Sequence, residues 1–168
     1  MLIGYSYSSE IPGYKKSALA KSETNDCVVK SIASVYQISY EEAHKIAKEQ
    51  FNRNDRQGTF YVLGTLNTLE KKNWIYNNKQ IEVIKGTEIS YLGSPRYQKR
   101  FIDNGYEIAP QKMTVGMITE KFNEGRYIIL INGHAFTLID GIIYGNNEDK
   151  KRKRAKVRGL IRIKDVVA

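Results

Sequence analysis

Residues 126–146 read RYIILINGHAFTLIDGIIYGN, and this stretch predicts the fold more clearly than any other part of the chain. β-Branched and aromatic residues, which favour strands, fill it except at Asn132-Gly133 and Asp140-Gly141. Both pairs are strong signals for hairpin turns of two residues. The stretch therefore predicts a meander of three antiparallel strands, with His134 at the start of the middle strand, near one rim of the sheet.

The single cysteine of the chain, Cys27, lies far upstream, at the start of a segment with helical periodicity. Apolar side chains recur at helical spacing from there to Tyr36, and Asp26 is a good N-cap residue. Unpaired amides and the positive end of the helix dipole favour a reactive thiolate at such a terminus. We therefore expect a thiol nucleophile with His134 as a distant imidazole partner. The alternative is that both residues only pack.

A thiol–imidazole pair works best when the far ring nitrogen has a hydrogen-bond acceptor. Asn146 and Asn147, at the end of the third strand, both supply one. A strict two-residue turn at Asp140-Gly141 places Asn147 opposite His134, whereas a bulge or a longer turn brings Asn146 onto that face. Asp140 is a poor candidate, because six residues of extended strand separate it from the histidine by roughly 20 Å.

These pieces resemble the papain-like cysteine peptidase superfamily. The resemblance rests on Asp26-Cys27 at a helix start and on the histidine hairpin from His134 to Asn146, in the order Cys, His, Asn. It is strongest to the small bacterial cell-wall and leader-peptide peptidases and to phage-encoded relatives. The resemblance implies that Cys27 is the nucleophile, His134 the general base and acid, and Asn146 the orienting residue. Such an enzyme needs no cofactor.

Papain-like enzymes often have a glutamine about six residues before the cysteine, where it donates a hydrogen bond to the oxyanion. This chain has Lys21 at that position. The backbone amide of Cys27 can supply one donor, and Asn25 or Ser22 can supply another. Asn25 is our oxyanion-hole candidate.

The net charge of +9 is unevenly distributed. Residues 149–164 contain nine lysines and arginines and one acid, whereas residues 1–148 are nearly neutral. A further strand is predicted at 157–163, so the preceding basic run forms a loop on the active-site side. We expect this loop to bind an acidic substrate, an acidic partner or a nucleic acid, or else to be a solvated loop. It consists of Lys150, Lys151, Arg152, Lys153 and Arg154.

A length of 168 residues with 41% hydrophobic residues fits a single domain over residues 1–168. One cysteine permits no internal disulfide, and residues 1–10 lack the pattern of a signal peptide. We therefore expect a cytoplasmic location, in a host cytoplasm or a virion if the protein is phage-encoded. No stretch reaches a membrane-spanning length, and one cysteine with two histidines falls short of a structural zinc set, so neither a membrane nor a metal is expected.

Helices are expected elsewhere in the chain. Residues 39–42 form a capping box for a helix that runs to about Phe51. His44 lies on its flank and is interpreted as a surface or packing residue, because nothing near it in sequence is a partner. Further helices are predicted at 59–72 and 114–123, and a strand at 80–85, while residues 86–112 show no sustained period.

Together these patterns predict an α+β, papain-like fold, in which N-terminal helices precede an antiparallel sheet of about four to six strands and the helix of Cys27 packs on that sheet. The expected function is hydrolysis of an amide or isopeptide bond in a peptide or protein by a Cys-His-Asn mechanism. The alternatives are an inert papain-like module that acts as a phage structural or host-interaction protein, and a nucleic-acid-binding protein that uses the basic loop.

Overall fold

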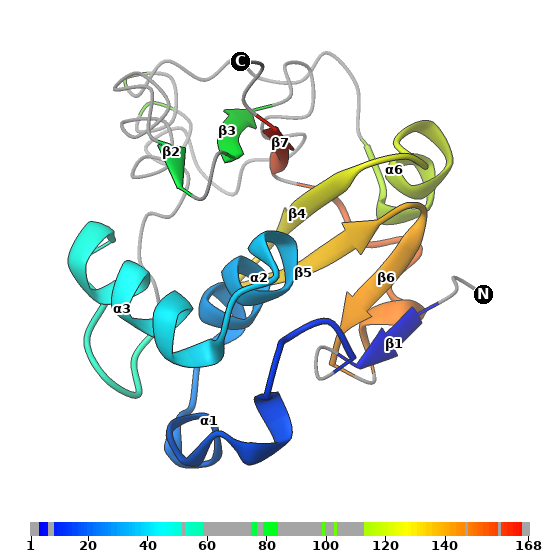
Figure 1. Ribbon diagram of the computed structural model, residues 1–168. Coiled ribbons are helices and arrows are strands. Elements are labelled where there is room, and N and C mark those ends of the chain that lie inside the picture. Colours follow the sequence, from blue (N-terminus) through cyan, green and yellow to red (C-terminus); the bar gives the residue numbers. More distant parts are fainter. Residues whose placement is uncertain are drawn as a thin grey trace.

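A computed structural model describes residues 4–6, 9–51, 53–58, 75–76, 79–83, 99, 103, 113–146, 148–157 and 159–165. Within these ranges helices and strands are mixed along the chain, so the fold is α+β (Figure 1). The predicted helix at 59–72 lies outside the described residues. The elements are β1 (Gly4–Ser6), η2 (Tyr14–Lys16), α1 (Ala18–Ser22), α2 (Cys27–Tyr36), α3 (Tyr40–Gln50), β2 (Ile75–Tyr76), β3 (Lys79–Val83), α6 (Val115–Lys121), β4 (Arg126–Ile131), β5 (His134–Ile139), β6 (Ile142–Gly145), η3 (Asp149–Lys151) and β7 (Gly159–Asp165).

The strands in the described part of the chain form one seven-stranded sheet in the order β1-β6-β5-β4-β7-β3-β2. Its centre is the predicted meander, since β4 pairs antiparallel with β5 and β5 with β6. Gly133, Asp140 and Gly141 have positive φ values, which the two tight turns require. The three-strand meander and both turns are therefore confirmed.

The sheet differs from the expected one at its edges. It has more than four to six strands, and it is mixed rather than antiparallel, because β1 runs parallel to β6. Strand β1 is three residues long, too short to show an alternating pattern, and β2 has two residues. Edge strands of this length are held by pairing with their neighbours, so the local sequence carried no signal for them.

Helix α2 packs across β5 and β4, as Figure 1 shows. Its buried side chains, among them Val29, Ala33 and Val35, belong to the main apolar core. At its C-terminal end, Arg126 of β4 donates through Nε to the carbonyl of Val35 at 2.8 Å and through Nη2 to the carbonyl of Ser34. These bonds satisfy carbonyls that a helix end leaves unpaired, and they hold α2 in place on the sheet.

The other helices begin where their caps predict. The Ser39 hydroxyl accepts from the backbone N–H of Glu42 at the start of α3, and the Thr114 hydroxyl accepts from that of Met117 at the start of α6. Both predicted helices are confirmed. Among the described residues, no helix has the length and apolar character that crossing a membrane requires.

Candidate active site

Cys27 is the first residue of α2, and His134 is the first residue of β5. Because α2 packs across β5, these two starts come together, and the Cys27 thiol lies near enough to the His134 imidazole to help raise its pKa. Both side chains are partly exposed. The structure thus brings together two predicted site residues that lie 107 positions apart in the sequence.

The acceptor that holds the imidazole is a carboxylate. The Nε2 atom of His134 lies 2.9 Å from Oδ1 of Asp149, a residue with no exposed surface. Because Nε2 faces Asp149, Nδ1 is the ring nitrogen left for the sulfur of Cys27. The structure therefore contains a line of carboxylate, imidazole and thiol.

The prediction that Asn146 orients the histidine is corrected by this geometry. Asn146 is exposed, and its contribution is a backbone N–H that donates to Oδ2 of Asp149 at 2.6 Å. The chain leaves the sheet after Gly145 and turns into η3, so the residue facing His134 comes from that turn and not from the strand. Asn147, the other candidate, lies outside the described residues. One feature of the sequence distinguishes Asp149 as a candidate for this role: it is the one acid in the basic stretch 149–164.

Several groups converge on the Asp149 carboxylate. Oδ1 accepts from Nε of Arg152 at 2.9 Å as well as from His134. Gly145 leaves room for Oδ2, because a Cβ at that position would overlap it. Burial acts to raise the pKa of Asp149, but the hydrogen bonds from His134, the Asn146 amide and Arg152 outweigh it and lower the pKa. Asp149 is thus held as a carboxylate.

Asp149 raises the pKa of His134. Its hydrogen bond is the largest cause that raises the pKa of His134 to about 9, and Cys27 adds to it, while burial opposes it. At neutral pH the ring is therefore an imidazolium. This cation lies beside a sulfur atom at a helix N-terminus, which is the environment that reactive cysteines have in proteins.

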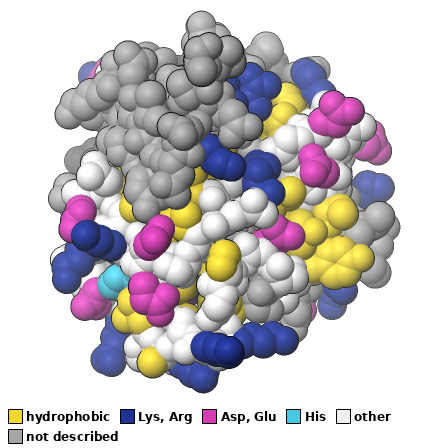
Figure 2. Space-filling view, in the orientation of Figure 1, with side chains coloured by type: hydrophobic (Ala, Val, Ile, Leu, Met, Phe, Trp, Pro, Cys, Tyr) yellow, Lys and Arg dark blue, Asp and Glu magenta, His cyan; other side chains and the backbone are white. Residues whose placement is uncertain are grey.

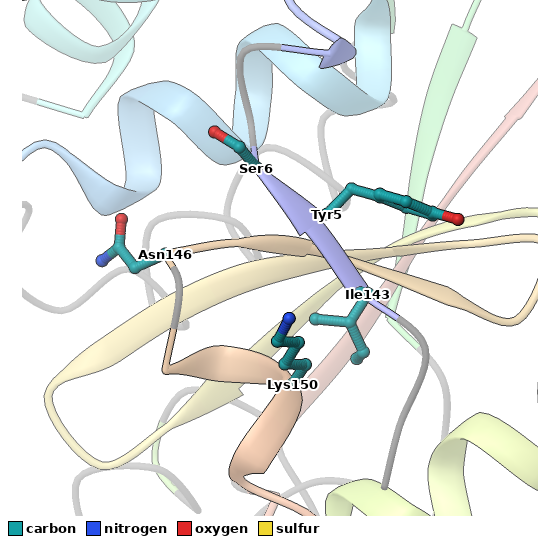
Figure 3. Close-up of a pocket in the computed structure, with 6 residues that line it drawn as sticks. Tyr5, Ser6, Ile143, Asn146 and Lys150 are labelled. Atoms are coloured by element: carbon teal, nitrogen blue, oxygen red, sulfur yellow. The ribbon is translucent and has the colours of Figure 1, made fainter.

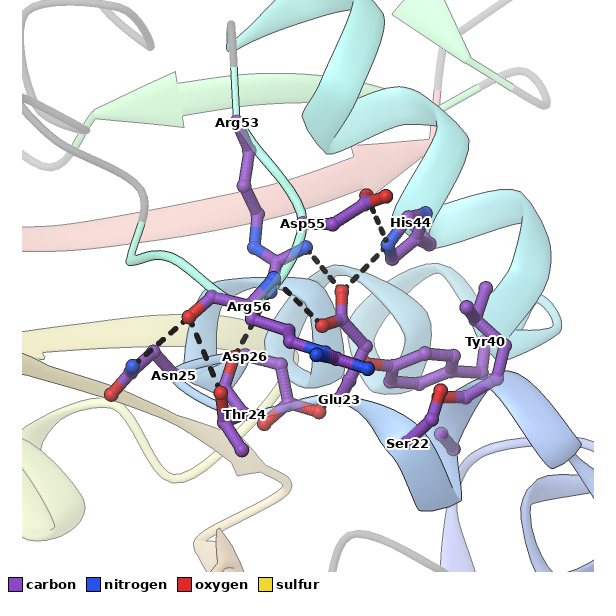
Figure 4. Close-up of polar contacts among 12 residues, drawn as sticks. Ser22, Glu23, Thr24, Asn25, Asp26, Tyr40, His44, Arg53, Asp55 and Arg56 are labelled. Atoms are coloured by element: carbon purple, nitrogen blue, oxygen red, sulfur yellow. Dashed lines mark hydrogen bonds and ion pairs between the residues drawn. The ribbon is translucent and has the colours of Figure 1, made fainter.

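A second buried histidine–carboxylate pair lies just before Cys27 (Figure 4). Oε2 of Glu23 accepts from Nη1 of Arg53 and lies next to Nε2 of His44, both at 2.7 Å, and Oε1 accepts from the backbone N–H of Arg56 at 2.8 Å. Burial acts to raise the pKa of Glu23, but these hydrogen bonds lower it to about 2. His44 is therefore no surface residue, and its partner comes from the segment before α2, far away in sequence.

The residues between Glu23 and Cys27 are fixed to the same loop. Thr24 and Asn25 both donate through their side chains to the carbonyl of Arg56, at 3.2 and 3.1 Å, and Asn25 has a left-handed φ of 52° (Figure 4). The amide nitrogen of Asn25, our oxyanion-hole candidate, is thus engaged in holding this loop. The backbone N–H of Cys27, in the first turn of α2, has no acceptor within the helix.

Asp26 stands at the N-cap position of α2, but its side chain does not cap the helix. Its carboxylate accepts from the Tyr40 hydroxyl at 2.7 Å and pairs with Lys30 at 3.3 Å. The expected N-cap hydrogen bond is therefore absent. Instead Asp26 connects the start of α2 to α3.

The basic loop begins at the site itself, since Asp149 precedes Lys150 directly. Arg152 contacts Asp149, Lys151 lies 3.5 Å from Oε1 of Glu148, and the backbone carbonyl of Lys153 accepts from the N–H of Gly116. The side chains from Lys151 to Arg154 are exposed, and that of Lys150 is partly buried. The loop lies beside the candidate active site, as expected.

Glu23, His44 and Asp55 are close enough to serve as metal ligands, with one ligand atom of each within 4.8 Å of the others. However, the Glu23 oxygen nearest His44 already accepts from the guanidinium of Arg53. Only 1% of the Arg53 side chain is exposed. A metal ion there would be placed against a buried positive charge. We therefore interpret the cluster as an ion-pair network.

No protein-family model, curated protein or solved structure matches this chain. The site must therefore be judged by its chemistry. It consists of a buried carboxylate, an imidazole and a thiol, aligned where a helix start meets a strand start in an α+β fold.

Proposed function

We propose that the protein is a papain-like cysteine peptidase or isopeptidase, in which Cys27 is the nucleophile, His134 the general base and acid, and Asp149 the orienting residue. The observation that carries this proposal is the line Asp149–His134–Cys27, with the carboxylate fully buried and the thiol partly exposed. A buried carboxylate that holds the imidazole and a sulfur that a substrate can reach are suited to nucleophilic catalysis.

The first half of the reaction forms an acyl-enzyme. The Cys27 thiolate attacks the carbonyl carbon of the substrate, a C–S bond forms, and the carbonyl electron pair moves onto the oxygen. The backbone N–H of Cys27 donates to this oxyanion. As the tetrahedral intermediate collapses, the C–N bond breaks and the His134 imidazolium gives its Nδ1 proton to the leaving amine.

The second half releases the acid. Neutral His134 accepts a proton from a water molecule, whose oxygen attacks the thioester carbon. The C–S bond then breaks, and the electron pair returns to the sulfur as a thiolate beside the imidazolium. The products are an amine and a carboxylic acid, and the enzyme returns to its starting state.

Asp149 supports both halves without exchanging a proton. It accepts a hydrogen bond at Nε2, so the ring keeps a proton there and presents Nδ1 to the sulfur. Its hydrogen bond is the largest reason why the pKa of His134 rises to about 9, and its negative charge adds to this effect. A carboxylate in this place differs from the asparagine that the papain-like pattern implies, and it binds the cation more strongly.

The experiment measures how fast iodoacetamide alkylates Cys27 at pH 7. We expect a rate on the order of tenfold above that of N-acetylcysteine amide, a neutral free thiol, because the imidazolium of His134 stabilises the negative charge of the attacking sulfur. His134→Ala should lower the rate to that of the free thiol, and Cys27→Ser should abolish labelling.

The matched control is His44→Ala, which removes the other buried histidine. It should leave the alkylation rate near that of the wild type. If His134→Ala reacts as fast as the wild type, or if the wild type reacts like a free thiol, Cys27 only packs and the peptidase proposal is wrong.

A further inference from the structure

Two hollows lie close to the segments that carry the candidate active site, and Ser6 lines both. The first, with a volume of about 160 Å³, lies between β1, the end of β6 and η3, and its polar lining includes Ser6, Asn146 and Lys150 (Figure 3). The second, of about 370 Å³, lies beside α1 and is lined by Ser6, Tyr14, Lys15, Ala20 and Lys21.

Each hollow is connected to the catalytic line by the chain itself. Asn146 donates its backbone N–H to Asp149, and Lys150 follows Asp149 directly. Lys21 stands six residues before Cys27, at the position where papain-like enzymes often place an oxyanion donor. The first hollow is therefore lined by residues that flank Asp149, and the second by a residue of the segment that leads to Cys27.

The described lining of both hollows carries positive charge. Lys15, Lys21 and Lys150 line them, and among the residues that the structure describes no aspartate or glutamate does. Acids on nearby elements have other partners, since Glu10 pairs with Arg126 at 3.5 Å and Glu41 accepts from Ser17. In Figure 2, lysine and arginine side chains gather along the lower rim of the molecule, where Figure 1 places α1.

In the first hollow, two hydrogen-bond donors are unused. Figure 3 shows the Lys150 side chain extending from η3 toward β1, with Asn146 on one side and Ile143 on the other. Within the described part of the chain, neither the Lys150 ammonium nor the Asn146 side-chain amide has a hydrogen-bond or ion-pair partner. An ammonium and an amide facing one small space are suited to a carboxylate.

We propose that these hollows are the subsites of an acidic peptide, which places one carboxylate at Lys150 and Asn146 and further acidic side chains along Lys15 and Lys21. This inference rests on the proposed function and names its substrate class. The volumes favour a peptide over a nucleic acid, because each hollow holds about one side chain and the second has the apolar surfaces of Tyr14 and Ala20 between its lysines. Nucleic-acid affinity instead needs many phosphate contacts along a continuous strip.

The test compares two alkylating reagents that differ in charge. Iodoacetate is an anion and iodoacetamide is neutral, so the ratio of their rates at Cys27 reports the local charge and not the thiol's intrinsic reactivity. At low salt, this ratio should exceed that of N-acetylcysteine amide by several times, and it should fall as salt is added. Lys21→Gln and Lys150→Gln should each lower the ratio by about two- to threefold. The control Lys48→Gln, on the exposed side of α3, should not change it.

The outcomes separate the two proposals. If both reagents react with Cys27 no faster than with the free thiol, the proposed function fails. If iodoacetamide reacts fast but the ratio equals that of the free thiol, or the two lysine variants leave it unchanged, the acidic-peptide inference alone is overturned.

A competition measurement identifies the anion. An acetylated triglutamate amide should protect Cys27 of the full chain from iodoacetamide, whereas the triglutamine analogue should not. A thymidine tetranucleotide, which carries the same charge as triglutamate, should protect less. Equal or better protection by the tetranucleotide would overturn the peptide assignment in favour of nucleic acid.

Discussion

The chain contains two buried histidine–carboxylate pairs, each with an arginine on its carboxylate, and they differ in that a thiol lies beside one of the histidines. In one, His134 lies 2.9 Å from Asp149 and contacts Cys27; in the other, His44 lies 2.7 Å from Glu23, which is also bound to Arg53. Both carboxylates are nearly inaccessible to solvent. A histidine held by a buried carboxylate is therefore not, by itself, a catalytic arrangement in this protein.

The presence or absence of the thiol decides what each pair can do. A thiol beside an imidazolium is a nucleophile with a proton donor next to it. His44 has no thiol beside it, and the buried Arg53 on its carboxylate holds the loop of residues 53–56 against the segment before α2, whereas the arginine on Asp149 is exposed. One pair is thus suited to chemistry, and the other fixes the backbone from which Cys27 projects.

The largest effect should come from removing the guanidinium of the structural pair. Arg53→Met leaves the buried Glu23 carboxylate without its main cation, and we expect it to lower the free energy of unfolding by about 3 kcal/mol. Urea unfolding measures this loss. Lys99→Met, which breaks the exposed pair with Asp103, should barely change the urea midpoint. Equal effects of the two substitutions would show that the Glu23 network does not stabilise the fold.

The two pairs should also respond to opposite ends of the pH scale. The pKa of His134 is raised from 6.5 to about 9, so its contribution to stability is complete below pH 6.5 and is lost as pH rises through 9. The pKa of Glu23 is lowered from 4.5 to about 2, so its contribution is complete above pH 4.5 and is lost as pH falls towards 2.

Urea unfolding between pH 2 and 10 tests both signs, and we expect changes of about 2 kcal/mol at each end. His134→Ala should remove the alkaline loss, and Glu23→Gln the acid loss. An alkaline loss that persists in His134→Ala would mean that another group carries it.

Substitutions of Asp149 separate its charge from its geometry. Asp149→Ala removes both and should slow iodoacetamide labelling of Cys27 at pH 7 by about tenfold. Asp149→Asn keeps an acceptor for Nε2 without the charge, so the loss should be smaller. Glu23→Gln should leave the labelling rate close to that of the wild type while reducing stability. If Glu23→Gln slows labelling as much as Asp149→Ala does, the division of roles between the two pairs is wrong.

A smaller loss of reactivity should follow from crowding Asp149. In Gly145→Ala, the new methyl group overlaps the Asp149 carboxylate, which must move away from His134. We expect labelling of Cys27 to slow severalfold. The control is Gly58→Ala, where a Cβ meets nothing within 4 Å and φ is not positive. Labelling at the wild-type rate in Gly145→Ala would show that the Asp149 contact is dispensable.

The smallest effect is expected at the possible ligand set of Glu23, His44 and Asp55. Because Arg53 occupies the Glu23 oxygen, addition of Zn²⁺ or of EDTA should not shift the thermal midpoint of unfolding. Asp55→Asn should change it little, since 65% of the Asp55 side chain is exposed. A stabilisation by Zn²⁺ that is lost in Asp55→Asn would instead identify a metal site.

The parts of this protein that could be predicted are those coded by neighbouring residues. The turns at Asn132-Gly133 and Asp140-Gly141 need backbone conformations that these residue types favour, and the helix starting at Ser39 needs a hydroxyl close to free amides. Such preferences act within a few residues, so they can be recognised in any sequence that contains them.

The amino-acid sequence alone determined the meander with His134 at its rim and the helix that begins at Cys27, because turn and periodicity signals are local. Only the tertiary structure decided that Asp149 holds the imidazole, that Glu23 joins His44 to Arg53, and that β1 completes the sheet edge in parallel. These pairings join segments whose relative position depends on how α2 and α3 pack and how the chain turns after Gly145. Packing is a property of the whole core, and no short stretch of sequence encodes it.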